Sequence, residues 1–408
     1  MNYLIIRGVI IIQSITDKDR IYVIDILRGI SIVGILFVNM LDFHSPFLYL
    51  ESDYWENKAD YYTYALIDIF AQGNYYPLFA FLFGFGSFIL MNRAKHKGIS
   101  FLALFTRRMT FLLILGMFHA FLIWHGDILI TYAVCGFLLL LVYKWSGKAL
   151  LRLSLGLYTI SYGLLGLLML LIEVVSTDST TVKTNVSKIN ESIAIYSSGS
   201  YSELFTLRFN DWLAVNGPPN MIFIFLSVFP CILAGIAFAK LGWLTNLEVY
   251  RQKLLIMFLV SFPIGLVFKL IPYLWEHNYA GEFIQDSIGG PLLTLAIITG
   301  VTLLYDQSAK FRKISFPFTR LGRMSLTNYL MHSIVCTLIF YSYGLGFYGE
   351  VGAFMGSMLA VLIILFQLLI SKYWFHYFKM GPIEYVWRLT TYRDKPSFKR
   401  EKEIDATR

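Results

Sequence analysis

The residues best suited to chemistry lie inside an apolar stretch that is long enough to cross a membrane, Arg20 to His44. Asp25 and Arg28 are three residues apart, so they share one face of a helix. An arginine at the centre of a membrane helix costs roughly 2.5–3.5 kcal/mol, so we expect Arg28 to face the protein interior with Asp25 as its partner. Asn39 follows after nearly three helical turns, about 16 Å further along the same face. The sequence therefore predicts a helix with a polar stripe directed inward.

Histidines within apolar stretches are candidates for proton transfer. His119 lies about 18 Å beyond the basic residues Arg107 and Arg108 at 1.5 Å per helical residue, well inside the membrane. A histidine there is the usual general base because its unperturbed pKa is about 6.5, although it could also serve only packing. Asp127 begins the next helix, where it could cap that helix, orient His119, or do both. His44, at the membrane exit, is a second candidate base or an exposed loop residue.

Two further groups of polar residues interrupt apolar stretches. Gln72 and Asn74 lie within the expected span 64–91, and such an interruption is tolerated only where it lines a cavity or is buried in protein. Asn328 and His332 fall on neighbouring positions of a later helix, where they line the same cavity or hold helices together by hydrogen bonds. We take all four, together with Asp25 and Arg28, as candidate substrate-binding residues.

The composition excludes an ordinary soluble protein. Of the 408 residues, 57% are hydrophobic and 15% are charged. The net charge of +8 comes from lysines and arginines in short connections, so it indicates membrane orientation and not binding to nucleic acid. The three cysteines lie in apolar stretches and suggest neither a disulfide framework nor a metal site: Cys135, Cys231 and Cys336.

Runs of about 20 apolar residues predict an all-α polytopic membrane protein with ten spans. Basic residues concentrate in alternate connections, and the positive-inside rule therefore places these connections and both termini in the cytoplasm. The intervening connections are acidic or polar. The expected spans are 21–43, 64–91, 108–125, 127–143, 149–173, 219–240, 252–274, 288–305, 322–344 and 351–371.

The chain divides into three parts on this basis. Residues 1–20 contain an apolar run that is too short to span, so we expect an interfacial segment. Residues 21–371 form the transmembrane helical domain, with 176–215 as a long external loop. Residues 372–408 form a basic cytoplasmic tail.

Four motifs together resemble the YeiB-like family, known as domain of unknown function 418. They follow one another over nearly the whole chain: Ile24 to Asn39, Arg107 to Gly136, Gly322 to Ser333, and Gly381 to Tyr392. That family is grouped with the transmembrane acyltransferases, whose relatives include the bacterial acyltransferase-3 enzymes and the lysosomal heparan-glucosaminide acetyltransferase. The resemblance implies a membrane acyltransferase that moves an acyl group from cytoplasmic acyl-CoA, with acetyl-CoA as the first candidate, to an extracytoplasmic glycan or small molecule.

The resemblance also implies roles for individual residues. His119 would take the proton of the acceptor hydroxyl as it attacks the thioester, with Asp127 orienting it and His44 as the second choice of base. Asn39 would donate to the developing oxyanion. The acyltransferase-3 enzymes have a catalytic histidine at the spacing of Asn39, whereas the heparan enzyme has an asparagine there. Arg28 would neutralise a CoA phosphate or support the channel through its acidic partner.

Two other classes of function are consistent with the residues alone. Ten spans with a polar interior could bind and move a small solute, and discontinuous spans in both halves would favour such a transporter. A scaffold or sensor that uses the external loop would leave the polar stripe of the first helix unexplained. The expected partners are the lipid bilayer of the bacterial cell membrane, acyl-CoA and the acceptor, with no metal, and a homodimer is left open.

Overall fold

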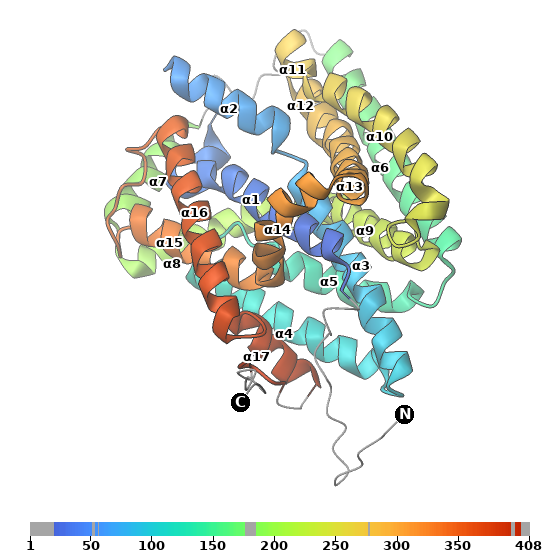
Figure 1. Cartoon of the computed structure of the whole chain (residues 1–408). Coiled ribbons are helices and arrows are strands. Elements are labelled where there is room, and N and C mark those ends of the chain that lie inside the picture. Colours follow the sequence, from blue (N-terminus) through green and yellow to red (C-terminus); the bar gives the residue numbers. More distant parts are fainter. Residues whose placement is uncertain are drawn as a thin grey trace.

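The computed structural model describes residues 20–50, 54–55, 57–175, 185–275, 278–392 and 396–400, and this part of the chain is all-α (Figure 1). A 3-10 helix at Phe47–Tyr49 follows α1, and a π-helix at Gln285–Gly289 joins α12 to α13. The α-helices are α1 (Tyr22–His44), α2 (Lys58–Phe70), α3 (Tyr75–His96), α4 (Phe101–Leu122), α5 (Leu129–Val142), α6 (Gly147–Val175), α7 (Val186–Ser198), α8 (Tyr201–Asn216), α9 (Pro218–Leu241), α10 (Leu247–Lys269), α11 (Ile271–Leu274), α12 (Tyr279–Ile284), α13 (Gly290–Gln307), α14 (Ala309–Arg323), α15 (Ser325–Phe340), α16 (Ala353–Tyr377) and α17 (Pro382–Tyr392).

Each of the ten expected spans contains a helix, although the span 64–91 covers the end of α2, the turn at 71–74 and most of α3. Among the described residues, eight helical segments are long and apolar enough to cross a membrane. The other two expected spans are shorter apolar helices, α5 with 14 residues and α15 with 16. The all-α, multi-pass architecture is therefore confirmed, and length alone identifies eight of the ten spans.

Large apolar side chains cover the outward faces of the peripheral helices α6 and α10, which lie at one edge of the bundle (Figure 1). Leu164 and Leu168 on α6 and Leu259 and Val267 on α10 are all exposed. A soluble protein rarely leaves such continuous apolar faces in water. These faces are suited to contact with lipid.

Glycines allow the central helices to approach backbone to backbone. A Cβ atom on Gly84 of α3 would lie 2.0 Å from the carbonyl oxygen of Ile232 on α9. On the other side of the bundle, a Cβ atom on Gly322 of α14 would lie 1.9 Å from the carbonyl oxygen of Asp25 on α1. Membrane helices use small residues in this way because lipid supplies little hydrophobic drive for their association. The second contact fixes Asp25 and its turn of α1 against α14.

Two segments expected as connections are helical. The basic connection after the eighth span forms α14, which packs on α1. Within the expected external loop, residues 186–216 form α7 and α8, and Arg208 donates hydrogen bonds to the carbonyls of Leu122 and Ile123 at the end of α4. We call α7 and α8 the external cap, since they cover this end of α4.

The two terminal parts of the predicted division, 1–20 and 372–408, can be compared with the described residues. The expected interfacial segment 1–20 lies outside the described residues except for Arg20. The expected tail 372–408 begins inside α16, which continues to Tyr377, and it contributes α17. Trp387 of α17 donates its indole N–H to the carbonyl of Arg108, 3.1 Å away, so α17 is fixed to α4.

Candidate functional site

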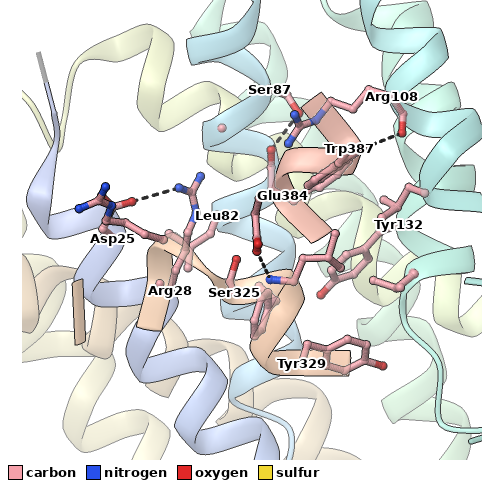
Figure 2. A pocket seen from close by; sticks show the side chains of 18 of the residues that line it. Asp25, Arg28, Leu82, Ser87, Arg108, Tyr132, Ser325, Tyr329, Glu384 and Trp387 are labelled. Carbon is pink, nitrogen blue, oxygen red and sulfur yellow. Dashed lines mark hydrogen bonds and ion pairs between the residues drawn. The ribbon is translucent and has the colours of Figure 1, made fainter. Parts of the chain in front are cut away.

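A cavity of about 220 Å³ opens among α1, α3, α4, α5, α14, α15 and α17, on the side that the basic residues mark as cytoplasmic. Figure 2 shows side chains from these helices converging on it. Its ionisable lining carries five arginines and two acids, which gives an excess of positive charge: Arg20, Arg28, Arg108, Arg323, Arg388, Asp25 and Glu384. Its deeper wall is apolar and aromatic and includes Phe83, Tyr132 and Tyr329. The cavity is thus built for an anionic ligand with an apolar end.

Asp25 positions two of the cavity arginines. Its carboxylate accepts a hydrogen bond from Arg20 Nε at 2.8 Å and one from Arg28 Nη1 at 3.3 Å. The pairing of Arg28 with Asp25 follows the helical spacing predicted from the sequence. Gly86 on α3 leaves room for the Arg28 guanidinium, because a Cβ atom there would lie 2.9 Å from Nη2. Arg28 is therefore held at the cavity wall between α1 and α3.

Arg108 is held by stacking. Its guanidinium carbon lies 3.5 Å from the centre of the Trp387 ring, a cation–π contact. This arrangement orients the charge while leaving the guanidinium N–H groups for a ligand, in the planar geometry that suits phosphate or carboxylate oxygens. The amphipathic helix α17 thereby completes the cavity. In the prediction from the sequence, α17 was part of the basic tail.

Glu384 of α17 caps the start of α15. Its Oε1 accepts the backbone N–H groups of Leu326 and Thr327, and its Oε2 accepts the hydroxyl of Thr327. Burial raises the pKa of the Glu384 carboxyl, and these hydrogen bonds only partly offset that effect. A carboxylate at a helix N-terminus also interacts favourably with the helix dipole. Glu384 thus fixes the register of α15 at the cavity wall.

Behind the deep wall lies a fully buried chain of three polar side chains, which we call the triad: Ser333, His119 and Asp127. His119 Nδ1 lies 2.8 Å from Asp127 Oδ1, and His119 Nε2 lies 2.8 Å from Ser333 Oγ. The second oxygen of Asp127 accepts the backbone N–H of Ile130 at 2.8 Å and so caps α5. Both interpretations of Asp127, the cap and the partner of His119, describe its contacts.

The triad adjoins the cavity through Tyr329. The ring centres of Tyr329 and His119 are 5.2 Å apart, and Tyr329 lines the cavity. Ser325, Tyr329 and Ser333 follow one another at intervals of four residues, so they lie along one face of α15. Since Ser325 also lines the cavity, this face leads from the cavity wall to the triad. One aromatic side chain therefore separates the cavity from His119.

A second cavity of about 380 Å³ shares Arg323 with the first. The side chains that line it include several basic groups and no acid: Arg320, Arg323, Lys372, His376 and Arg400. The Arg323 guanidinium also donates to the carbonyl of Lys379 and stacks on Phe375. This cavity is suited to phosphate groups.

On the outer side of the triad, Trp124 separates His119 from an ion pair. The Trp124 ring centre is 6.3 Å from that of His119 and 5.8 Å from that of His125. His125 Nε2 in turn lies 3.1 Å from Asp42 Oδ2. Burial lowers the pKa of His125, but Asp42 and Asp211 more than offset this, so the net pKa lies above its ordinary value.

Polar atoms without partners gather near this outer ion pair. Among the described residues, the indole N–H of Trp124, Nδ1 of His125 and the hydroxyl of Tyr341 are buried and accept or donate no hydrogen bond. Asp211 of the external cap accepts hydrogen bonds from the hydroxyls of Tyr49 and Tyr196. Buried polar groups are usually satisfied, so three free polar atoms in one buried region are unusual.

Four predicted site residues lie away from the triad. His44 is fully buried between the rings of Trp55 and Phe340, so its interpretation as an exposed loop residue is wrong. His332 bonds Gln367 of α16 through Nε2 at 2.8 Å, and Gln367 donates to the carbonyl of Asn328. These contacts match the interpretation of His332 and Asn328 as helix-joining residues. Asn39 is half-buried on α1, and neither it nor the other three residues line the two cavities.

Gln72 and Asn74 lie at another place, where two interrupted helices meet. The chain turns at 71–74 between α2 and α3, with Gly73 at φ 70°, and this turn contacts the π-helix segment. Lys269 donates to the carbonyl of Gln72 at 3.0 Å and to Asp286 Oδ1 at 2.9 Å. Thr294 donates to the carbonyl of Asn74 at 2.6 Å. These side chains supply the hydrogen bonds that the broken helices lack.

Further hydrogen bonds extend this arrangement. Asp68 accepts from the hydroxyl of Tyr273 and from Gln285 Nε2, which also donates to the carbonyl of Lys269. We call the whole set the helix-break network: Asp68, Lys269, Tyr273, Gln285, Asp286 and Thr294, with the backbone of residues 72–74. The predicted site residues thus divide between the arginine cavity, the triad, the outer end of α1, the α15–α16 contact and this network.

Three residues that complete the site are not predicted by the sequence. Ser333 ends one of the four motifs, but a lone serine in an apolar helix carries little signal. Arg108 is one of the basic residues that predict membrane orientation, and Glu384 lies in the predicted tail. The pairing of Arg108 with Trp387 and the capping by Glu384 both depend on how α17 folds back over α4 and α15. No local pattern specifies these contacts.

Comparison with known proteins gives consistent matches. A family model described as "Protein of unknown function (DUF418)" matches residues 238–394. The uncharacterized protein YxaH of Bacillus subtilis (strain 168) is 36% identical over 401 residues, which cover 93% of this chain and 96% of that relative. The uncharacterized protein YeiB of Escherichia coli (strain K12) is 26% identical over 92% of this chain and 97% of its own length.

Proposed function

Because the chain belongs to the YeiB-like DUF418 family of membrane proteins, and the names of its relatives state no function, we propose a function from the geometry of the site. The protein is an acyltransferase of the bacterial cytoplasmic membrane. It moves an acyl group from cytoplasmic acyl-CoA to an acceptor on the outer side, such as a glycan or a small molecule. The observation that carries this proposal is the His119–Asp127 pair directly behind an arginine-lined cavity.

The two cavities suit the two ends of an acyl-CoA. The arginine cavity, at about 220 Å³, is small beside typical ligand pockets of roughly 300–1,000 Å³, so it would hold only the acyl end of the donor, with its arginines binding the nearest phosphate groups. Its apolar deep wall suits an acyl chain. The second cavity shares Arg323 and has only basic ionisable groups, so it would hold the remaining phosphate. An acyl-CoA lying across both would present its thioester toward Tyr329.

His119 can act as the base of acyl transfer. Asp127 accepts a hydrogen bond from Nδ1–H of His119, which leaves Nε2 as a proton acceptor on the opposite side of the ring. A buried carboxylate that orients a histidine in this way also stabilises the imidazolium formed during proton transfer. Such a base contributes about 10²–10⁴-fold to the rate.

The acceptor would approach from the outer side. The Asp42–His125 ion pair and the free hydroxyl of Tyr341 offer hydrogen-bonding groups for a hydroxyl or amine. The external cap covers this region through Arg208, so it would select which acceptors enter. Donor and acceptor would thus reach His119 from opposite faces of the membrane.

The test uses purified protein in lipid nanodiscs. We expect saturable binding of acetyl-CoA or a longer acyl-CoA that weakens in Arg28→Ala, and thioester cleavage that is lost in His119→Ala. His332→Gln is the matched control, because His332 is also a buried histidine with a hydrogen-bonded ring, but its partner is the amide of Gln367 and not a carboxylate. Folded wild-type protein that binds no acyl-CoA would contradict the proposal.

Transport of a small solute is the second candidate, and one observation favours it. The interruption at 71–74 meets the π-helix Gln285–Gly289, so irregular helical segments from both halves of the chain lie together, and transporters often have such irregular helices at their binding sites. Against this, the helix-break network pairs the freed carbonyls of Gln72, Asn74 and Lys269 with side chains of the protein. Solute uptake that persists in His119→Ala but fails in Lys269→Met would favour transport.

A further inference from the structure

Ser333 occupies the position of the nucleophile in a Ser-His-Asp triad. Its Oγ lies 2.8 Å from Nε2 of His119, whose Nδ1 lies 2.8 Å from Asp127, and all three side chains are fully buried. We propose that Ser333 is a catalytic nucleophile that carries the acyl group as an ester between donor and acceptor. This inference rests on the proposed acyl transfer and adds to it a covalent intermediate.

The hydrogen bonds around Asp127 fix the direction of proton transfer. Asp127 Oδ2 accepts the backbone N–H of Ile130, and Oδ1 faces Nδ1 of His119. A carboxylate only accepts hydrogen bonds, so the ring proton lies on Nδ1 and the lone pair on Nε2. The hydroxyl of Ser333 must then donate to Nε2. This is the arrangement that activates a serine hydroxyl, which is otherwise a weak nucleophile.

The face of α15 gives Ser333 a route to the donor. Ser325 and Tyr329 line the arginine cavity, and Ser333 follows one turn later, about 6 Å further along the helix. The Tyr329 ring covers His119, and its hydroxyl donates weakly to the carbonyl of Gly126 at 3.3 Å. Rotation of this one side chain would bring an acyl thioester in the cavity within reach of Ser333.

The two steps balance without any other reagent. In the first, Ser333 Oγ forms a bond to the thioester carbonyl carbon while its proton moves to Nε2 of His119. The carbon–sulfur bond then breaks, and the CoA thiolate takes that proton from His119 and leaves as a thiol. In the second, the acceptor hydroxyl or amine attacks the seryl ester, His119 takes its proton, and the ester bond to Ser333 breaks as Oγ regains a proton.

A free donor lies beside the triad for the negative charge that develops in both steps. The indole N–H of Trp124 is buried and has no hydrogen-bond partner among the described residues, and its ring centre is 6.3 Å from that of His119. An indole nitrogen only donates, so it is suited to an oxyanion. Asn39, expected in this role from the sequence, lines neither cavity, and the same is true of Trp124, so it is the ring contact with His119 that favours Trp124.

A covalent relay fits the layout of the site. The arginine cavity lies on one side of His119 beyond Tyr329, and the Asp42–His125 pair lies on the other side beyond Trp124. With direct transfer, donor and acceptor would have to meet in one small space. With an ester on Ser333, CoA leaves before the acceptor arrives, so the two substrates never need to be bound together.

The experiment detects the ester. Wild-type protein in nanodiscs is incubated with radiolabelled acetyl-CoA and no acceptor, then digested and analysed by mass spectrometry. We expect one acetyl group on the α15 peptide, at Ser333, which is absent in Ser333→Ala and in His119→Ala. Ser154→Ala is the matched control, because the buried Ser154 hydroxyl also bonds a neighbouring helix, at the carbonyl of Pro230. It should retain the label.

A second probe separates this inference from the proposed function. A fluorophosphonate reacts with activated serines whatever the natural donor is, so labelling of wild-type protein that is lost in Ser333→Ala supports the nucleophile even if acetyl-CoA is not bound. If wild type and Ser333→Ala cleave acetyl-CoA equally and neither forms an adduct, transfer is direct and Ser333 is not the nucleophile. Folded wild-type protein that reacts with neither reagent also overturns this inference.

Discussion

The triad and the helix-break network are both buried and polar, but their hydrogen bonds have different partners. In the triad, His119 uses both ring nitrogens on side chains, Asp127 and Ser333, next to a cavity. In the helix-break network, Lys269 bonds a backbone carbonyl at an interrupted helix as well as Asp286. Both networks contain buried ionisable groups at membrane depth, so each is a candidate functional site.

The difference teaches how to separate function from architecture in a membrane interior. Broken helices leave carbonyls that lipid cannot satisfy, so the polar groups of the helix-break network have a structural reason to exist. No broken helix accounts for the link between His119 and Ser333, which joins two helices distant in sequence beside an arginine-lined cavity. Removing the triad should therefore affect activity most, and removing the helix-break network should affect stability most.

The largest effect is expected from His119→Ala. Loss of the proton acceptor should lower acyl-CoA turnover about 10⁴-fold, or roughly 5.5 kcal/mol in the activation free energy, as when a catalytic triad loses a member. The midpoint of thermal unfolding should also fall, because the buried Asp127 and Ser333 lose a hydrogen-bond partner, so turnover is compared per folded molecule. Turnover and unfolding are measured on the same nanodisc preparation. A large loss of stability with unchanged turnover per folded molecule would assign the triad to architecture.

The helix-break network should give the opposite result. Lys269→Met leaves Asp286 and the carbonyl of Gln72 without their partner, so we expect a loss of about 3 kcal/mol in unfolding free energy. This is the lower end of the range for buried pairs, because the side chain of Asp286 is 37% exposed. Turnover per folded molecule should stay near wild type.

A double variant sharpens this result. Lys269→Met combined with Asp286→Leu removes both charges, so it should be more stable than Lys269→Met alone, since no uncompensated charge remains. Chemical unfolding in detergent measures both variants. If instead the double variant lost acyl transfer or solute uptake while staying folded, the helix-break network would have a role in function.

The arginine cavity should show a smaller, binding-specific effect. Arg108→Gln removes a charged donor that Trp387 holds in place, so the dissociation constant for CoA should rise about tenfold, or roughly 1.4 kcal/mol. The effect should shrink at high salt, because screening weakens the contribution of the charge. Arg312→Gln is the control, since Arg312 is exposed on α14 and bonds only the carbonyls of Tyr305 and Asp306. Titration calorimetry that shows equal losses in both would mean that Arg108 is not a ligand-binding residue.

The smallest effect is expected from Glu384→Gln, on the pH dependence of the free energy of unfolding. Its pKa is raised in the folded protein, so the folded state binds this proton more tightly than the unfolded state. The contribution of Glu384 to stability is therefore greatest below the ordinary glutamate pKa, and it declines as the pH rises through the raised value. Glu384→Gln should remove this part of the slope. Unfolding midpoints measured from acidic to neutral pH test it, and an unchanged slope would contradict the assignment.

Several features of the molecule could be predicted from local sequence. The ten apolar stretches gave the all-α, multi-pass architecture, because the length of an apolar run is compared directly with the thickness of the membrane. The contact of Asp25 with Arg28 followed from helical spacing. The contact of His119 with Asp127 could also be predicted, since the two are eight residues apart across one short connection.

The remaining features depended on contacts between distant segments. His119 and Ser333 are 214 residues apart, and their meeting requires α4 and α15 to pack in one particular register. The same reason explains why His332, adjacent to Ser333, turns to α16 instead, and why α17 folds back to complete the arginine cavity. The sequence by itself determined the helices, their membrane character and the polar contacts within one or two turns, because these depend on local spacing. Only the tertiary structure decided which polar residues share a site, because that depends on how the helices pack.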